Sequence, residues 1–182
     1  MTRILEISDT ELRQLNFYRV SELNGGLLLG QLLRGVRNPE LIRQLTRHSA
    51  EEVVHSQRWM ETIFAVGGEP SPTSDSYQAR YGAAMRPPST IVEVLALTQV
   101  FERRVFRHFT EHLGRPATHP RVKATLRRML DEERGHLSWV KQWLDAAAGR
   151  GVSVKALLRR YSAIDAEVYA TLTRDYGWRV AA

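Results

Sequence analysis

The chain has 182 residues, with 26 Lys and Arg against 20 Asp and Glu, and it contains no cysteine. Without thiols there are no disulfides, thiolate zinc sites, iron–sulfur clusters or thiol nucleophiles, so any metal must be held by carboxylates and imidazoles. No apolar run reaches the roughly 18 residues of a membrane span, and the first residues do not resemble a signal peptide. These features predict a cytoplasmic protein with one domain over residues 1–182, without a membrane partner.

Helical spacing of apolar residues runs through most of the chain, and no strand is predicted. Ser8 or Asp9 is the expected N-cap of the first helix, and Asn38 followed by Pro39 predicts the start of the second. The first helix carries leucines at helical spacing up to Leu28, and its glycines predict a kink or the close approach of a partner: Gly25, Gly26 and Gly30. The predicted segments are helices at about 8–36 and 39–66, a proline-rich crossover at 69–88 with a helical turn near 77–84, and helices at about 89–113, 120–148 and 153–175.

Two long helix pairs joined by a long crossover predict an all-α four-helix bundle. The short connection within each pair makes its two helices antiparallel, and the bundle core spans about residues 9–148. The helix at about 153–175 is an addition. Its apolar stripe, which either closes the bundle or forms a homodimer, consists of Leu157, Leu158, Tyr161, Ile164, Val168 and Leu172.

Two segments of the chain match each other, and both contain Glu-x-x-His in the middle of a predicted helix. One is Glu52 with His55, and the other is Glu133 with His136. Residues three apart lie on one helix face, so each pair offers a carboxylate and an imidazole to the same metal ion. Chance alone gives roughly half of one such match, so the two matches are suggestive but do not decide the question.

A second regularity supports the metal interpretation. The midpoint of residues 22 and 52 falls beside the Asn38-Pro39 break, and the midpoint of residues 102 and 133 falls in the turn at 114–121. Residues equidistant from the turn of an antiparallel hairpin lie at the same height, so Glu22 and Glu102 each lie level with one Glu-x-x-His. Four Glu and two His are then expected to meet in the bundle. Carboxylates on largely apolar stretches are costly unless they are paired or bind metal.

For each of five other residues, a role at the metal site is weighed against an ordinary structural role. Gln99 is a hydrogen-bond partner for the ligands or a polar residue at the bundle edge. Tyr18 orients a ligand or relays an electron, although core packing is favoured. His48 is a candidate ligand at a site where metal enters the protein, although a surface or core histidine is favoured. His108 and His112 form an i, i+4 pair for which adventitious binding of zinc at the surface is expected.

The order Glu, Glu-x-x-His, Glu, Glu-x-x-His resembles the ferritin-like diiron-carboxylate family, which includes rubrerythrins and bacterioferritins. The resemblance covers about residues 9–148 and implies a ferritin-like bundle. By this resemblance, Glu52 and Glu133 would bridge the two metals. Glu22 and Glu102 would be terminal carboxylates, and His55 and His136 would be terminal imidazoles. The absence of a Cys-x-x-Cys tail excludes a classical two-domain rubrerythrin, and the second imidazole argues against a classical ferritin. Residues 74–109 are loosely similar to the tRNA-modifying diiron hydroxylases.

The function that this resemblance implies is a non-haem diiron oxidoreductase that activates O₂ or peroxide at a Glu4His2 site. Its cofactor would be two Fe ions, with Mn or a mixed Mn/Fe pair as the alternative. An oxygenase or hydroxylase is favoured, with a separate electron-donor protein and a small or anionic substrate, tRNA being one candidate. The alternatives are a rubrerythrin-like peroxidase and ferritin-like iron oxidation and storage in an oligomer. The net charge of +6 fits an anionic partner, but the basic residues are scattered, which favours a solvated surface.

Overall fold

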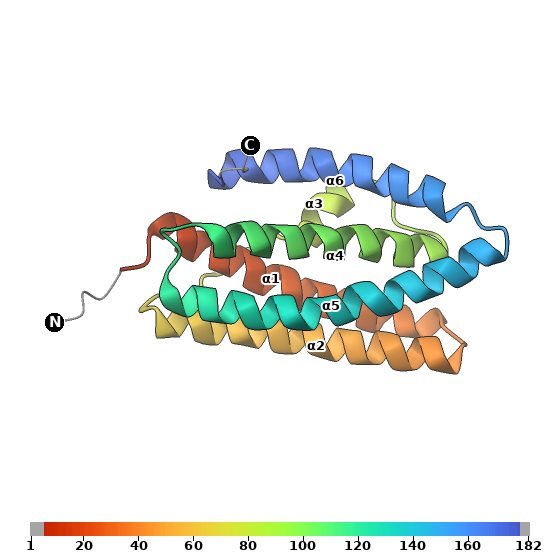
Figure 1. Cartoon of the computed structure of the whole chain (residues 1–182), viewed down its shortest axis with the longest axis horizontal. Helices are drawn as coiled ribbons and strands as arrows, with labels where there is room; N and C mark the ends of the chain where they lie inside the picture. The colour runs from red at the N-terminus through yellow and green to blue at the C-terminus, as the bar shows by residue number, and fades with distance from the viewer. Residues whose placement is uncertain (1–5, 179–182) are drawn as a thin grey trace. The chain divides into compact units, whose positions relative to one another are not determined.

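Helices make up all the regular structure between residues 6 and 178, the part of the chain that this computed structural model describes. The bounds are Asp9–Leu32 for α1, Pro39–Ala65 for α2, Tyr77–Ala84 for α3, Ile91–Gly114 for α4, Pro120–Gly149 for α5 and Val154–Tyr176 for α6, with a short 3-10 turn, η1, at Leu33–Gly35 (Figure 1). The all-α prediction is therefore confirmed. Among the described residues, no helix is both long and apolar enough to cross a membrane.

The helix ends lie close to where the local sequence predicts them. The Ser8 hydroxyl accepts the Glu11 N–H at 3.2 Å, and the Asn38 side chain accepts two N–H groups in the first turn of α2. Both predicted N-caps are therefore confirmed. The predicted stop after α2 is also confirmed, because Gly67 adopts φ +81°, which favours glycine. The first α-helix ends at Leu32, earlier than the predicted residue 36, and η1 follows it.

The described residues form two compact units. The first unit comprises residues 6–79 and 112–128, and the second comprises residues 80–111 and 129–178. The α4–α5 turn and the adjoining ends of both helices belong to the first unit, and the rest of α4 and α5 belongs to the second. The single ferritin-like domain expected over residues 1–182 stays a prediction.

In the first unit, α1 and α2 form an antiparallel hairpin whose turn contains η1 (Figure 1). The helices approach closely at Gly26, whose carbonyl oxygen accepts the Ser49 hydroxyl at 2.7 Å. A Cβ at Gly26 would lie 2.9 Å from the Ser49 carbonyl oxygen, so a larger residue would push the helices apart. Close approach of a partner is therefore the role of this glycine, and α1 remains helical through it.

The face of α1 that carries Gly26 packs against α2, and this determines which leucines of α1 are buried. Leu15 is fully buried, whereas Leu27 and Leu28 are 55% and 46% exposed, so the apolar spacing does not mark the buried face there. Residues next to Gly26 along a helix point about 100° and 200° away from it, which carries them off the contact. The fully buried core of this unit comprises Leu15, Phe17, Leu45, Trp59, Ile63, Val122 and Leu126.

In the second unit, α6 packs on α4 around a buried ion pair. The Arg104 guanidinium donates to Asp165 through Nε, at 2.9 Å, and through Nη2, at 2.5 Å. The Tyr81 hydroxyl donates to the same carboxylate at 2.5 Å. Burial, followed by the charge of this carboxylate, raises the pKa of Tyr81 above its ordinary value.

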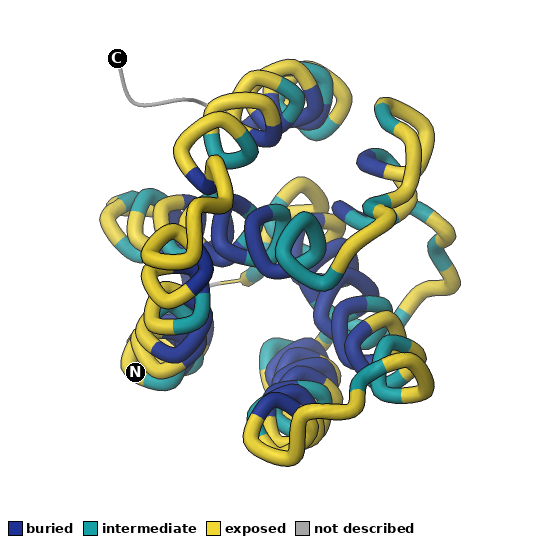
Figure 2. Tube along the Cα trace, turned by 90° about the vertical axis from the view of Figure 1, so that its right-hand side faces the viewer, coloured by how far each residue is buried: buried dark blue, intermediate teal, exposed yellow. Residues whose placement is uncertain are grey.

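The apolar stripe of α6 faces inward within its own unit. In Figure 2 the helix that leads to the C-terminus has buried positions on one side and exposed positions on the other. The most buried members of the predicted stripe are Tyr161, Val168 and Leu172. Of the two roles expected for this stripe, packing within the chain therefore accounts for its buried positions.

Candidate metal centre

The first unit brings one carboxylate of α1 next to the Glu-x-x-His of α2. One ligand atom from each of Glu22, Glu52 and His55 lies within 4.8 Å of the other two. These residues are 4%, 2% and 0% exposed. Glu52 and His55 share a face of α2 because they are three residues apart, and the antiparallel hairpin brings Glu22 level with them. We call these three residues triad 1.

The second unit contains the corresponding group, triad 2, from Glu102 on α4 and from Glu133 and His136 on α5. The Nδ1 atom of His136 lies 2.8 Å from a carboxylate oxygen of Glu133 and 4.0 Å from one of Glu102. All three residues are at most 3% exposed. The structure thus places every sequence-predicted ligand in one of two buried groups of the same composition.

A third imidazole lies against triad 1. The Nε2 atom of His48 is 2.8 Å from Oε1 of Glu52, and His48 is 1% exposed. His48, Glu52 and His55 lie at positions i, i+4 and i+7, which share one helix face. Of the two favoured expectations, a surface or a core histidine, the structure supports the second, and the contact with a predicted ligand was missed. The His-x-x-x-Glu spacing was the signal for it.

Two buried carboxylates beside one imidazole give each triad a donor set for a divalent transition metal. Carboxylate oxygens and imidazole nitrogen suit Fe²⁺, Mn²⁺ and Zn²⁺, so the ligand types do not select among these ions. Ionised carboxylates are costly to bury without a compensating charge. A bound cation would supply that charge, and the residues of both triads therefore fit a metal.

The backbone of α1 approaches triad 1 closely at Gly25. A Cβ added at Gly25 would lie 3.5 Å from Oε2 of Glu52 and 3.3 Å from Nε2 of Gln78. Gly25 is three residues after Glu22 and therefore lies on the same side of α1. The absence of a side chain at Gly25 therefore lets α1 approach the Glu52 carboxylate and the Gln78 amide without a steric clash.

Gln99 lies one helical turn before Glu102 on α4 and is 2% exposed. Its Oε1 accepts no hydrogen bond from the residues that the structure describes. The expectation of a residue at the bundle edge is therefore wrong, because the side chain is buried. A buried amide oxygen on the face of a predicted ligand is an acceptor for a water or hydroxyl group near triad 2.

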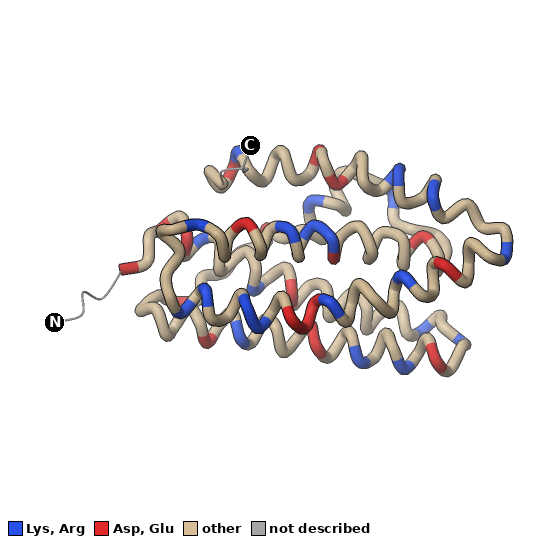
Figure 3. Tube along the Cα trace, in the orientation of Figure 1, with Lys and Arg blue, Asp and Glu red and all other residues tan. Residues whose placement is uncertain are grey.

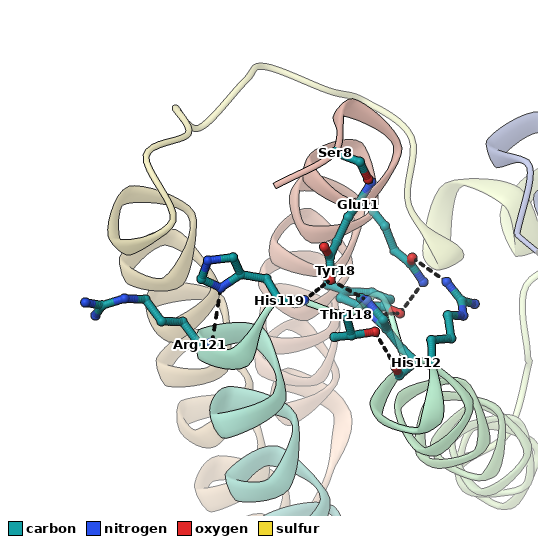
Figure 4. A network of polar contacts seen from close by, with 9 residues as sticks. Ser8, Glu11, Tyr18, His112, Thr118, His119 and Arg121 are labelled. Atoms are coloured by element: carbon teal, nitrogen blue, oxygen red, sulfur yellow. Dashed lines mark hydrogen bonds and ion pairs between the residues drawn. The ribbon is translucent and has the colours of Figure 1, made fainter. Parts of the chain in front are cut away.

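A hydrogen-bond network surrounds Tyr18, which lies one helical turn before Glu22 (Figure 4). The Tyr18 hydroxyl is 3.2 Å from Nδ1 of His112, and Nε2 of the same imidazole is 3.1 Å from Oε1 of Glu11. That carboxylate oxygen also accepts the backbone N–H of His119 at 3.2 Å. The network joins α1 to the last turn of α4, through His112, and to the α4–α5 connection, through His119, all within the first unit.

The expected surface zinc site at His108 and His112 is wrong, because these residues are 0% and 1% exposed. His108 packs against the rings of Tyr169 and Trp178, with ring centroids 5.4 and 4.3 Å away. Burial lowers the pKa of His112 below its ordinary value, and the hydrogen bond to Glu11 opposes that shift. Glu11 is 101 residues away in the chain, so no local pattern indicated this partner.

We expect the buried His112 to make the protein less stable in mild acid. Below the ordinary histidine pKa of about 6.5, the unfolded chain takes up a proton that the folded His112 resists. The free energy of unfolding should therefore fall as the pH drops below about 6.5, until the lowered pKa is passed. In urea titrations, His112→Gln should reduce this slope by up to about 1.4 kcal/mol per pH unit. Equal slopes in both proteins would contradict the expectation.

Comparisons with known proteins supply no relative from which a function could be transferred. No protein-family model, no curated protein and no solved structure matches the chain. The function must therefore be inferred from the chemistry of the two triads and of the residues around them.

Proposed function

We propose that both triads hold iron and that the protein is a non-haem diiron oxidoreductase with a ferritin-like bundle. One observation carries this proposal: each compact unit contains a buried group of two carboxylates and one imidazole built on the same Glu-x-x-His pattern. A single buried Glu–His contact is common as a structural ion pair. Two groups with matching composition and chain order favour a shared chemical role.

In the arrangement that the sequence predicts, the two triads share one pair of metal ions. Glu52 and Glu133 would then be the bridging carboxylates. Glu22 and Glu102 would be the terminal carboxylates, and His55 and His136 the imidazole ligands. Neutral imidazole nitrogens would bind the metals, and His48 would hold Glu52 in place through its 2.8 Å contact. Mn²⁺ and mixed Mn/Fe pairs remain alternatives for this donor set.

Iron held in this way would supply the electrons that reduce O₂ or peroxide. The protein's own contribution is to keep bulk water away, because all six ligands are at most 4% exposed. The Gln99 amide oxygen would accept a hydrogen bond from a hydroxyl group near triad 2. Electrons would come from a separate donor protein, since the chain has no cysteine for an electron-relay cluster.

The charge distribution bears on the choice of substrate. Lys and Arg are spread along the helices and interspersed with Asp and Glu (Figure 3). Nucleic-acid binding typically uses clustered basic residues on one face. We therefore place a small substrate ahead of tRNA, with an oxygenase or hydroxylase reaction as the main proposal.

The test is to load the metal-free protein anaerobically with Fe²⁺, and then to measure metal content, particle mass and the rate of iron oxidation. We expect about two irons per chain on a small oligomer. Oxidation by O₂ should be rapid and should require both triads. The matched control is Glu51→Ala. Glu51 is adjacent to Glu52 in the chain, but its carboxylate pairs with Arg47 at the surface.

The same measurements separate the alternatives. A large shell that holds many irons per chain would indicate storage, and faster oxidation by peroxide than by O₂ would indicate a peroxidase. Iron content no higher than that of a Glu52→Ala/His55→Ala/Glu133→Ala/His136→Ala variant would refute the metal assignment.

A further inference from the structure

Tyr18 lies between triad 1 and a hydrogen-bonded histidine. It is four residues before Glu22 on α1, while Trp59 is four residues after His55 on α2. In an antiparallel hairpin both rings therefore lie about 6 Å along the helices from triad 1, toward the same end. Their ring centroids are 5.0 Å apart, and the two residues are 1% and 0% exposed. An electron moving from Tyr18 toward triad 1 would cross a dry region about one helical turn long.

The contacts of Gln14 and His112 with the Tyr18 hydroxyl are consistent with a hydroxyl proton that points at His112. Arg115 Nη1 donates to Oε1 of Gln14 at 3.0 Å, which directs the Gln14 amide nitrogen toward Tyr18. That nitrogen donates to the Tyr18 oxygen at 2.5 Å. Because the oxygen already accepts this bond, its own hydrogen is available for Nδ1 of His112, 3.2 Å away.

His112 is arranged to accept that hydrogen. Its Nε2 faces a carboxylate oxygen of Glu11 at 3.1 Å, so Nε2 carries the ring's hydrogen and Nδ1 is the basic nitrogen. The same oxygen of Glu11 accepts the backbone N–H of His119 at 3.2 Å, which holds the carboxylate beside the imidazole ring. A negative charge at Glu11 would stabilise the imidazolium that forms when Nδ1 takes up a second proton. The cationic Arg115 opposes this charging, as does burial, so His112 is neutral before the transfer.

We propose that Tyr18 is a redox-active residue whose hydroxyl proton moves to Nδ1 of His112 when the ring loses an electron. The O–H bond breaks and an N–H bond forms, which yields a neutral tyrosyl radical and an imidazolium paired with Glu11. The electron goes to a one-electron oxidant. In the working protein that oxidant is the oxidised iron of the proposed function, and this one part of the inference rests on that function. Return of one electron from the donor protein and of the proton from His112 restores tyrosine.

The surroundings of two other buried tyrosines show why this role falls to Tyr18. Tyr81 donates to the Asp165 carboxylate, which also accepts from Arg104, and a carboxylate is a weaker base than imidazole by about 2.5 pKa units. Tyr77, which is 2% exposed, packs its ring edge-on against Phe17 at 5.0 Å. The Tyr18 hydroxyl, in contrast to that of Tyr81, lies 3.2 Å from an imidazole nitrogen.

The experiment oxidises the full-length, metal-free chain with photogenerated ruthenium(III) tris(bipyridine) and detects tyrosyl radical by electron paramagnetic resonance. We expect a long-lived radical that is lost in Tyr18→Phe and retained in Tyr77→Phe, the matched control for a buried tyrosine of the same unit. His112→Gln keeps a hydrogen-bond acceptor but cannot take the proton. It should therefore slow radical formation by about 100-fold, as expected for loss of a positioned base, and it should weaken the deuterium isotope effect.

Undiminished radical in Tyr18→Phe would overturn the proposal, and an unchanged rate in His112→Gln would overturn the role of His112. If Tyr18→Phe does not fold, 3-fluorotyrosine introduced at position 18 answers the same question. The fluorine should alter the radical spectrum, and an unaltered spectrum would count against Tyr18. Because the oxidant is external and no iron is present, these outcomes do not depend on the diiron proposal. Failure of iron loading would refute that proposal alone.

Discussion

Replacing Glu52 and His55 together by alanine is expected to remove both metal ions of an iron-loaded chain, although triad 2 keeps all its residues. The reason is the bridging role proposed for Glu52: a carboxylate shared by two ions holds each of them. Glu133→Ala/His136→Ala should have the same effect. Metal analysis after anaerobic Fe²⁺ loading and gel filtration should fall from about two ions per chain to near zero in either variant.

The pattern of losses distinguishes one dinuclear site from two separate ones. If the triads bind iron independently, each double variant keeps about one ion per chain. If neither triad binds metal, the variants and the unaltered chain have the same background content. Glu51→Ala and Glu132→Ala serve as controls, since each removes a carboxylate adjacent in sequence to a proposed ligand. Both controls should retain the full metal content, which would exclude a general effect of lost charge on α2 and α5.

Asp165→Ala should have the largest effect on stability of any single substitution considered for this protein. It leaves the buried Arg104 guanidinium without the carboxylate that accepts its Nε and Nη2 hydrogens. It also removes the acceptor of the Tyr81 hydroxyl. Breaking a buried ion pair from one side typically costs about 3–5 kcal/mol, because an uncompensated charge stays in the interior. The free energy of unfolding, measured in urea, should fall by an amount in that range.

Asp175→Ala is the matched control for this measurement. Asp175 lies on the same helix and pairs with Arg80 at 2.5 Å, but its side chain is 51% exposed. Exposed ion pairs contribute about 0–1 kcal/mol, so the loss should be small. Equal losses in the two variants would show that burial does not determine the strength of the Arg104–Asp165 pair. Asp165→Asn, which keeps the shape but removes the charge, should lie between them.

The membership of the two triads could be predicted because it depends on regular geometry. Glu52 and His55 share a face through the helical repeat, and a symmetric hairpin brings Glu22 to the same height. The same reasoning brings Glu102 to Glu133 and His136, and the structure places each group together within its own unit. Their function as metal ligands stays a prediction.

The exact face of a helix that packs inward could not be predicted in the same way. Val53 and Val54 are apolar and precede the fully buried His55, yet they are 44% and 42% exposed. The spacing of Leu27 and Leu28 was equally misleading. At both places the approach of α1 and α2 at Gly26 decides which side of each helix lies inside. Hydrophobicity alone does not encode that approach, because glycine contributes little to an apolar pattern.

The sequence by itself determined the helices, their caps and breaks, and the composition of each triad, because all of these follow from contacts within a few residues or from the helical repeat. Only the tertiary structure decided which distant groups became partners. Glu11 reaches His112 across 101 residues, and Arg104 reaches Asp165 across 61. Such pairs form where packed helices exclude water, because buried polar groups then need hydrogen-bond partners within the protein. The partners are chosen by proximity in the folded protein, so their positions in the sequence follow no regular spacing.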